Sequence, residues 1–362
     1  MHAVGARPNF VKLAPVFDAL AQLGGLRQLL VHTGQHYDPR LSDRVLDDLG
    51  LPVPDRHLGV GSGTHAEQTG RIMVAFEPVL LEERPDLVVV AGDVNSTLAC
   101  ALTAAKFGVP VAHIESGLRS FDWTMPEELN RVLTDRLSTL LFTHSPEAAE
   151  NLAAEGIAPG RVHYVGNTMI DSLLRLVGAA RDRAAWSGLG LERGGYLLVT
   201  LHRPSNVDDP VRLAAIVEAL AELGACEDVV FPLHPRTAAA LDRSGLHERL
   251  AATVRVLEPL GYLDFLSLET AAGAVLTDSG GVQEEAAALG VRCYTFRANT
   301  ERPITVTLGT NTLLGEDPAA IRGIRFDDRP PEPRKIPLWD GRAGERTAET
   351  IAAALDAWPA GG

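Results

Sequence analysis

Short apolar runs alternate with longer helical stretches along almost the whole chain. In the first half, the apolar runs fall at residues 29–31, 87–90 and 109–114. In the second half, they fall at residues 196–200, 229–231, 254–257 and 274–277. A parallel strand needs a crossover helix to bring the chain back beside it, so this alternation is typical of parallel sheets. The pattern predicts an α/β fold made of two doubly wound, Rossmann-like halves.

The two series of runs predict two domains and a closing segment. Residues 178–195 show no clean strand pattern, so the domain boundary is expected near 165–175. The predicted parts are an N-terminal domain over 1–168, a C-terminal domain over 169–342, and a last helix within 343–362 that packs back on the N-terminal domain. A helix over 172–190 is expected to enter the second domain, and the proline-rich stretch 328–341 to run irregularly over the surface.

The composition argues against a nucleic-acid-binding protein, a disulfide- or zinc-stabilised domain and a membrane-spanning protein. The chain carries 33 basic and 47 acidic residues, a net charge of −14, whereas proteins that bind nucleic acid usually carry the opposite sign. An anionic ligand would therefore be held by a local group of basic side chains. The cysteines are far apart, so neither a zinc motif nor a disulfide framework is indicated, and a cytoplasmic location is expected. No apolar run approaches the ~18 residues of a membrane span.

The stretch 274–290 is the most informative part of the chain. An apolar run leads into Asp-Ser-Gly-Gly, and a helix is expected to follow from about Val282, directly after this turn. Ser279, Gly280 and Gly281 would leave backbone N–H groups at the positive end of that helix, which is a cradle for an anion. Glu285 lies one turn further on the same helix face, where it could bind a ribose. A plain strand-to-helix turn explains the same residues equally well.

Two carboxylates follow successive strands of the first half. Asp93 comes after the run 87–90, and Glu115 comes after the run 109–114. Because neighbouring parallel strands end at the same edge of a sheet, both side chains are expected to converge there and to take acid and base roles. Asp93 is also explained as a helix N-cap. No comparable structural reason accounts for Glu115, which favours a functional role.

A third carboxylate, Glu127, stands at the start of a helix that is expected to run to about residue 142. Thr124 lies three residues before Glu127 and fits a capping box, with Pro126 in the first turn. This structural explanation is sufficient by itself. A role for Glu127 as a further acid or base is the alternative, and the local sequence does not decide between them.

Basic side chains follow other predicted strands. His202 stands directly after a strand beside Arg203, a place that suits binding or protonating a phosphate oxygen. Arg7 and Lys12 lie in the first strand-to-helix turn, and Arg302 lies in a loop after a later short strand. Each guanidinium or ammonium group could pair with a phosphate. Solvated surface charge is the plain alternative for these cations.

Absent motifs narrow the function further. The chain has no G-x-x-x-x-G-K-[ST] loop, and no G-x-G-x-x-G follows the first strand, which argues against a P-loop enzyme and a dinucleotide dehydrogenase. No His, Cys and carboxylate cluster has the spacing of a metal site, so no metal is expected. Only about four residues precede Gly5, which is short for a central strand, and the natural protein is therefore expected to begin a few residues earlier.

The candidate residues stand in motifs that resemble those of the non-hydrolysing UDP-N-acetylglucosamine 2-epimerases. The resemblance runs from Gly5 to about Gly315 and so covers most of the chain. The matching blocks are Gly-Ala-Arg-Pro (5–8), Thr-Gly-Gln-His (33–36), Gly-Asp (92–93), His-Ile-Glu-Ser-Gly-Leu-Arg (113–119), Pro-Glu-Glu-Leu-Asn-Arg (126–131), Gly-Asn-Thr-Met-Ile-Asp (166–171), His-Arg (202–203), Thr-Asp-Ser-Gly-Gly-Val-Gln-Glu-Glu (277–285) and Thr-Glu-Arg-Pro (300–303). Each block alone is weak, but the set in this order is specific.

This resemblance implies a fold of the glycosyltransferase B type, with a UDP-sugar in a cleft faced by both domains and with no metal or other cofactor. It implies inversion of carbon 2 of the sugar through a 2-acetamidoglucal intermediate, as UDP leaves carbon 1 and adds back. The residues that match the family's catalytic positions are Asp93, Glu115, Glu127 and His202. Those that match its substrate-binding positions are Arg7, Lys12, Phe265 at the uracil, Ser279, Gly280, Gly281, Glu285 at the ribose, and Arg302. A homodimer is also implied.

The chain departs from the family at two motifs. Gln35-His36 is followed by Tyr-Asp-Pro at 37–39 instead of a further polar amide, which argues against the regulatory substrate site of many bacterial members. His202 stands in Leu-His-Arg-Pro-Ser-Asn instead of Gly-His-Arg-Arg-Glu, a difference consistent with a modified substrate such as a UDP-diacetamido-uronate. Three further functions stay open: a hydrolysing 2-epimerase that releases UDP and N-acetylmannosamine, a glycosyltransferase of the same fold, and a non-catalytic UDP-sugar sensor.

Overall fold

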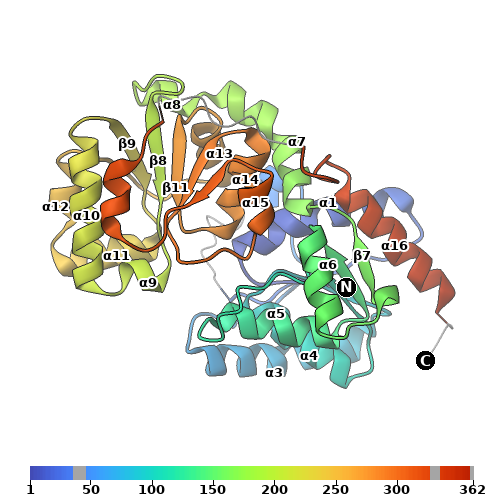
Figure 1. Ribbon diagram of the computed structural model, residues 1–362. Helices are drawn as coiled ribbons and strands as arrows, with labels where there is room; N and C mark the ends of the chain where they lie inside the picture. The colour runs from blue at the N-terminus through green and yellow to red at the C-terminus, as the bar shows by residue number, and fades with distance from the viewer. Residues whose placement is uncertain (36–45, 327–334, 359–362) are drawn as a thin grey trace. The chain divides into compact units, whose positions relative to one another are not determined.

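Residues 1–35, 46–326 and 335–358 are described by the computed structural model, apart from the side chain of Arg7. Contacts within the chain divide it into two units, drawn in Figure 1. Unit 1 comprises Met1–Ser172 and Pro337–Gly362, and unit 2 comprises Leu173–Ile336. Each unit has its own parallel sheet and its own buried core.

Unit 1 is built on a seven-stranded parallel sheet with the order β3-β2-β1-β4-β5-β6-β7. The strands are β1 (His2–Val4), β2 (Leu30–His32), β3 (Arg56–His57), β4 (Val88–Ala91), β5 (Val111–Ile114), β6 (Leu140–Thr143) and β7 (Val162–Tyr164). The helices are α1 (Arg7–Leu23), α3 (His65–Glu83), α4 (Asn95–Lys106), α5 (Pro126–Leu137), α6 (Pro146–Ala154), η1 (Pro159–Arg161), α7 (Thr168–Arg183), which continues into unit 2, and α16 (Ala343–Ala357). Every residue of β4, β5 and β6 is buried, which explains their almost continuous apolar sequence.

Unit 2 is built on a six-stranded parallel sheet with the order β10-β9-β8-β11-β12-β13. The strands are β8 (Tyr196–Thr200), β9 (Asp228–Pro232), β10 (Arg255–Leu257), β11 (Ala274–Thr277), β12 (Arg292–Thr295) and β13 (Asn311–Leu313). The remaining helices are α8 (Ala185–Gly188), α9 (Pro204–Val207), α10 (Pro210–Gly224), α11 (Pro235–Ser244), α12 (His247–Ala251), α13 (Tyr262–Glu269), α14 (Gly280–Leu289), α15 (Pro303–Thr307) and η2 (Pro318–Gly323).

Helices cover both faces of the unit 2 sheet. Successive residues of a strand point to opposite faces, and along β8 Leu197 joins one buried cluster while Leu198 joins another. Leu220 of α10 packs in the first cluster, and Leu268 of α13 and Ala286 of α14 pack in the second. Figure 1 shows α10 and α12 beside one face of this sheet and α13 and α14 beside the other. Unit 2 is thus a three-layered, doubly wound domain.

The strand order changes direction at one place in each sheet. In unit 1, β1 pairs with both β2 and β4, and in unit 2, β8 pairs with both β9 and β11. Both sheets therefore follow the Rossmann order, and ligands of such sheets bind beyond the carboxyl ends of the strands at this switch point. The segments that follow β1, β4, β8 and β11 are the first places to look for a site.

The structure confirms the predicted strands more closely than the predicted helix ends. The runs 196–200 and 274–277 form β8 and β11, and residues 343–357 form α16. The helix expected over 172–190 is confirmed as far as Arg183, where α7 ends, but its predicted end is wrong, because Ala184 adopts a left-handed backbone before the short α8. Of the proline-rich stretch, residues 328–334 lie outside the described residues.

The helix expected to begin near Glu127 is present as α5, but its predicted end at residue 142 is wrong. It ends at Leu137, where Ser138 is extended, and the apolar residues 140–143 form strand β6 in the core of the sheet. The predicted helix included residues of a buried strand, because a short apolar run has the same sequence pattern in a buried helix and in a buried strand. In the described parts of the chain, no helix combines the length and the apolar character that crossing a membrane would require.

Helix α16 packs against α1 within unit 1. Gly344 N donates to Asp171 Oδ2 at 2.7 Å, which fixes the start of α16. A Cβ on Gly344 would lie 2.6 Å from Pro15 O and 2.7 Å from Pro15 Cβ, so the two helices meet where only glycine fits. The backbones of α16 and α1 approach closely at this point, which explains why Gly344 stands in the first turn of α16.

We expect Gly344→Ala to lower the free energy of unfolding by about 1–3 kcal/mol, because the methyl group forces α16 away from α1. Gly178→Ala is the matched control, since Gly178 lies within α7 with no atom within 4 Å of its added Cβ. That change should stabilise the protein by about 0.5–1 kcal/mol through helix propensity. Urea unfolding followed by circular dichroism measures both, and equal midpoints for the two variants would contradict the packing argument.

Candidate functional site

The candidate carboxylates of unit 1 lie where β4 and β5 end. The two strands pair with Ala91 opposite Ile114, and Gly92 N donates to Ile114 O at 3.0 Å. Asp93 and Glu115 therefore leave adjacent strands at the same edge of the sheet. This edge lies next to the place where β1 and β4 pair, at the switch point of unit 1.

Lys12 of α1 joins Glu115 at this edge. Lys12 Nζ and Glu115 Oε2 form an ion pair, and their side chains are only 9 % and 8 % exposed. Gly92 has a φ of 67°, and a Cβ there would lie 2.9 Å from Lys12 Nζ and 3.5 Å from Glu115 Oε2. A side chain at residue 92 would collide with this buried ion pair, so a glycine is required there. Arg7 is the first residue of α1, and its side chain lies outside the described part of the structure.

Glu115 has an unusual backbone conformation. Its φ of 66° lies in the left-handed region, where a residue with a side chain is disfavoured by about 1–3 kcal/mol. The following residues hold it there: Ser116 N donates to Phe142 O at 3.0 Å, and Gly117 N donates to Asp135 Oδ2 at 3.0 Å. Strain that the surroundings maintain in this way is frequent at functional sites. Glu115 is therefore the strongest catalytic candidate of unit 1.

Asp93 is held by α5 and does not cap a helix. The N-cap of α4 is Val94, so the structural explanation of Asp93 as an N-cap is wrong. Arg131 Nη1 lies 3.0 Å from Asp93 Oδ2, and Asn130 Nδ2 donates to Asp93 O at 2.9 Å. Helix α4 begins one residue later than a cap at Asp93 requires, which leaves the carboxylate available to the buried guanidinium of Arg131.

Glu127 lies on the same face of α5 as the two residues that hold Asp93. It precedes Asn130 by three residues and Arg131 by four, and such positions are neighbours on a helix. The capping box expected from Thr124 is wrong, since Met125 is the N-cap and Thr124 Oγ1 donates to Asp122 Oδ1 at 2.6 Å. The half-buried Glu127 therefore has no capping role. Its place on this face of α5 is consistent with a role beside Asp93 and Glu115.

In unit 2, His202 and Asp278 meet at the carboxyl ends of β8 and β11. These strands pair with Thr200 opposite Thr277, which sets the residues that follow them side by side. His202 Nδ1 lies 3.0 Å from Asp278 Oδ1. His202 N and Arg203 N also donate to the Asp278 carboxylate, at 3.0 Å and 2.9 Å. A short helix, α9, follows directly, so His202 is not itself a helix cap.

Asp278 is a functional candidate that sequence reasoning missed, although it stands in the Asp-Ser-Gly-Gly turn. Its side chain is completely buried. Burial alone would raise its pKa, but the charge of His202 and hydrogen bonds from His202, Asn206 and Arg203 lower the pKa of Asp278 to about 2. The signal available in the sequence was the place of Asp278 directly after β11, the strand whose partner β8 ends two residues before His202. Which distant residue an acidic group faces depends on strand pairing, which local sequence does not reveal.

The turn after β11 leads directly into a helix. Helix α14 begins at Gly280, two residues before the expected start, and Ser279 is its N-cap with no side-chain capping bond. A Cβ on Gly280 would lie 2.2 Å from Arg302 Nη1, so the guanidinium of Arg302 lies directly against Gly280. Gly281 is the second residue of the helix. The positive end of α14 and a buried guanidinium thus come together where an anion would be stabilised.

Buried carboxylates hold the guanidinium of Arg302 in place. Arg302 Nε lies 3.1 Å from Glu284 Oε1, and Arg302 Nη1 lies 3.4 Å from Glu301 Oε2. Glu301 also receives two bonds from Arg297, at 2.7 and 2.8 Å. Burial would raise the pKa of Glu301, but these bonds and the charges of the neighbouring arginines hold it well below its usual value. Arg302 is therefore a fixed cation.

Glu285 lies one turn into α14, beside α13. Tyr262 OH donates to Glu285 Oε1 at 2.7 Å. Burial raises the pKa of Glu285 to about 7, against the hydrogen bond from Tyr262, and the charge of Glu284 raises it further. Phe265 follows Tyr262 by three residues on α13 and packs, partly buried, against the core of unit 2. The ring of Phe265 and the carboxylate of Glu285 thus stand on α13 and α14, two helices that are joined by the bond from Tyr262 to Glu285.

Glu269, at the end of α13, is a buried acid that sequence reasoning did not single out. Its side chain is completely buried, and neither carboxylate oxygen has a hydrogen-bond partner among the described residues. Burial raises the pKa of Glu269 well above its usual value, and the charge of Glu285 raises it further. Burial therefore favours the neutral form of Glu269.

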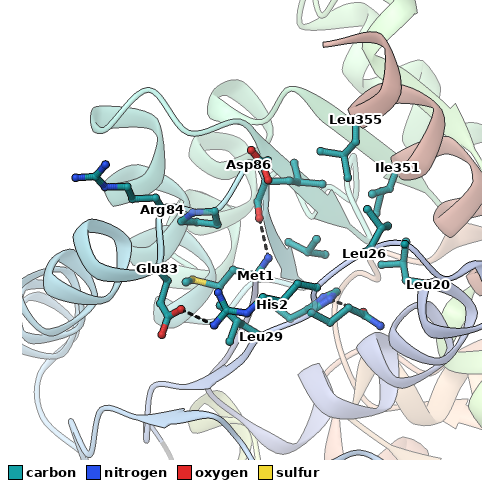
Figure 2. Close-up of a pocket in the computed structure, with 16 residues that line it drawn as sticks. Met1, His2, Leu20, Leu26, Leu29, Glu83, Arg84, Asp86, Ile351 and Leu355 are labelled. Carbon is teal, nitrogen blue, oxygen red and sulfur yellow. Dashed lines mark hydrogen bonds and ion pairs between the residues drawn. The ribbon is translucent and has the colours of Figure 1, made fainter. Parts of the chain in front are cut away.

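The cavity drawn in Figure 2 lies at the other end of the unit 1 sheet. It has a volume of about 230 Å³ and is lined by residues at the amino ends of β1 and β4, including His2 and Leu87, and by Leu355 of α16. Ligand sites of parallel sheets lie beyond the carboxyl ends. The candidate residues do not line this cavity. Within the described ranges, no group of His, Cys, Asp and Glu side chains is arranged to hold a metal ion.

Comparison with known proteins assigns the family. A sequence model described as UDP-N-acetylglucosamine 2-epimerase matches residues 18–352. The UDP-N-acetylglucosamine 2-epimerase of Methanocaldococcus jannaschii is 43 % identical over 357 residues, which cover 96 % of this chain and 97 % of that protein. The chain belongs to the UDP-N-acetylglucosamine 2-epimerase family.

Other members of the epimerase family support the same fold. A crystal structure of the Methanocaldococcus jannaschii enzyme in complex with UDP-GlcNAc and UDP superposes with a TM-score of 0.90 at 41 % identity, covering 97 % of this chain and 99 % of that one. The UDP-2,3-diacetamido-2,3-dideoxy-D-glucuronate 2-epimerase of Pseudomonas aeruginosa is 46 % identical over 316 residues, 86 % of this chain and 87 % of that protein. The fold is of the glycosyltransferase B type, as the sequence resemblance implied.

One motif of the epimerase family falls partly outside the described residues. Gln35 is described, and its Oε1 accepts bonds from Ser96 N at 2.9 Å and from Ser96 Oγ at 2.7 Å. Residues 36–39, on which the expected loss of a regulatory substrate site depends, lie outside the described part of the structure. The expectation about that site stays a prediction.

We expect Glu269→Gln to stabilise this epimerase-family chain by about 1–3 kcal/mol near neutral pH, because it removes an ionisable group that burial disfavours. The native state retains a proton on Glu269 that the unfolded chain releases above its ordinary pKa of 4.5. The stability of the wild type should therefore fall, relative to the variant, as pH rises from that value toward the raised native pKa.

Urea unfolding at several pH values tests this, with Glu227→Gln as the control because Glu227 is exposed. The control should leave the unfolding midpoint unchanged at every pH. A difference between Glu269→Gln and the wild type that stays constant with pH would contradict the raised pKa of Glu269.

Proposed function

We propose that this chain catalyses the reversible inversion of carbon 2 of UDP-N-acetylglucosamine, giving UDP-N-acetylmannosamine. The observation that carries the proposal is the buried ion pair of Lys12 with Glu115, at a strained residue directly after β5. A second carboxylate, Asp93, stands at the neighbouring strand end. Membership of the UDP-N-acetylglucosamine 2-epimerase family supports the reaction, and a structural relative has been seen with UDP-GlcNAc and UDP.

The reaction requires acid and base groups on both faces of carbon 2. A base removes the proton from carbon 2 while the bond from carbon 1 to the diphosphate oxygen breaks with its electron pair, which leaves 2-acetamidoglucal and UDP. UDP then adds back to carbon 1, and carbon 2 takes a proton on the opposite face. We assign this proton transfer to Asp93, Glu115 and Glu127, without a choice of face for each. A positioned carboxylate contributes about 10²–10⁴-fold to such a step.

The basic groups of the chain are assigned to UDP. Charge develops on the diphosphate as it leaves, and fixed cations and helix N–H groups stabilise such charge without rearranging. In the proposal His202 and Arg302 contact the diphosphate, Glu285 binds the ribose, and Phe265 packs on the uracil. The further contacts with the substrate are assigned to Arg7, Lys12, Ser279, Gly280 and Gly281. No cofactor is needed for this chemistry, since the electrons stay within the substrate.

A modified sugar is the second candidate substrate. The specific observation in its favour is the relative from Pseudomonas aeruginosa, whose name states a UDP-diacetamido-glucuronate. A carboxylate at carbon 6 and a second acetamido group would need additional cationic and amide partners around the sugar. The elimination and re-addition of UDP would be the same for both sugars, so the assigned roles do not depend on the choice.

The assembly and location of the enzyme are part of the proposal. A homodimer is supported by large exposed apolar side chains on α3 and α5, the two helices of unit 1 that pack against α4, since exposed apolar surface marks contact sites. They are Val74 and Leu81 of α3 and Leu129 and Leu133 of α5. A cytoplasmic location is supported by Cys100, Cys226 and Cys293, which are all free thiols.

Incubation with UDP-N-acetylglucosamine in deuterium oxide, followed by NMR, tests the reaction. We expect a mixture of the two UDP-sugars with deuterium at carbon 2, because the proton is exchanged with the enzyme and solvent during inversion. Free UDP with free N-acetylmannosamine would instead identify a hydrolysing enzyme. A parallel incubation with the UDP-diacetamido-glucuronate identifies the preferred sugar by the ratio of kcat/KM values. No change in either sugar without an acceptor would favour a glycosyltransferase or a sensor.

We expect Glu115→Gln to lower kcat by about 10²–10⁴-fold while the Kd for UDP changes only a few-fold, because the amide cannot accept a proton. Steady-state kinetics and calorimetric titration with UDP measure the two quantities. Glu150→Gln is the control, since Glu150 is an exposed carboxylate of the same unit and should leave both quantities unchanged. Retained turnover in Glu115→Gln would contradict the assigned role of Glu115.

A further inference from the structure

One of the two ring nitrogens of His202 faces a buried carboxylate. Nδ1 lies 3.0 Å from Oδ1 of the completely buried Asp278, while the His202 side chain as a whole is 35 % exposed. The carboxylate of an ionised Asp can only accept, so the proton of this bond belongs to Nδ1 of the histidine. The other nitrogen, Nε2, lies on the opposite side of the ring.

We propose that Asp278 is a positioning residue for His202: its buried carboxylate accepts the Nδ1 proton, so that Nε2 is the atom presented to the leaving diphosphate. This inference rests on the proposed function, in which His202 contacts that diphosphate. Asp278 itself is buried beneath the histidine and acts through it.

The bonds around Asp278 fix its orientation as well as its charge. Oδ2 accepts from Arg203 N at 2.9 Å and from Asn206 Nδ2 at 3.0 Å, which leaves Oδ1 toward the ring. The backbone N–H of His202 donates to the same carboxylate at 3.0 Å. One carboxylate therefore determines both the path of the chain at His202 and the rotation of its ring. A ring held at two points loses little freedom when it binds a phosphate oxygen.

Asp278 places a buried carboxylate directly against the ring of His202. The other ionisable groups nearby are His234, whose ring centroid lies 5.2 Å away, and Arg203, whose Nε donates to Asp278 O and whose Nη2 lies 3.4 Å from Glu301. Asp278 is the acidic group in direct contact with the ring. An imidazolium can donate from Nε2 to the diphosphate as negative charge accumulates there.

The variant Asp278→Asn tests the proposal, with Asp242→Asn as the matched control. The amide keeps the size of the side chain but removes its charge, so kcat should fall roughly 10- to 100-fold and the pH profile of kcat should change. Asp242→Asn makes the same substitution at an exposed carboxylate of unit 2. It should leave both kcat and its pH profile unchanged. Matching profiles for Asp278→Asn and the wild type would overturn the proposal.

A measurement on the wild-type protein covers the case in which Asp278→Asn does not fold. NMR of the chain labelled with ¹⁵N-histidine, with the His202 signals assigned from the variant His202→Gln, reports which ring nitrogen carries a proton. We expect the neutral ring to carry its proton on Nδ1, because the Asp278 carboxylate accepts it. A neutral ring that carries its proton on Nε2 would overturn the proposal. This readout needs no substrate, so it stands apart from a failure of the proposed reaction, which the incubation in deuterium oxide detects.

Discussion

Pairing between central parallel strands decides which side chains meet in each unit. In unit 1 the register of β4 against β5 sets Asp93 and Glu115 at one edge, and in unit 2 the register of β8 against β11 sets His202 beside Asp278. A slip of one residue would turn each strand over and separate these groups. The candidate chemistry thus depends on backbone hydrogen bonds in the core of each sheet, because the loops that carry the residues begin where those bonds end.

Compensation of buried charge is the second feature that the two units share. The compensated pairs are Lys12–Glu115, Arg131–Asp93 and His202–Asp278. Burial opposes ionisation in each pair, and a partner in contact offsets that penalty when the geometry is good. Glu269 differs, since its carboxyl oxygens have no hydrogen-bond partner in the described residues. Burial without such a partner favours the neutral form of Glu269.

The sequence predicted strands and strand ends better than helix starts. The apolar runs at 196–200 and 274–277 became β8 and β11 unchanged, because strands buried on both faces have a continuous apolar signal. Caps were misplaced at Asp93 and Thr124, and in both places the N-cap is the next residue along the chain. A cap is set by the φ and ψ angles of one residue, and these depend on contacts with other elements as much as on local sequence.

The sequence by itself determined the fold class, the family and the strand ends at which the candidate residues stand, because all three follow from local patterns of residues. Only the tertiary structure decided the partners: Lys12 for Glu115, Arg131 for Asp93 and Asp278 for His202. Each partner comes from another strand or helix. The partner is selected by the register of the strands and by the packing of the helices on the sheet. Neither of these can be predicted from the residues around a single motif.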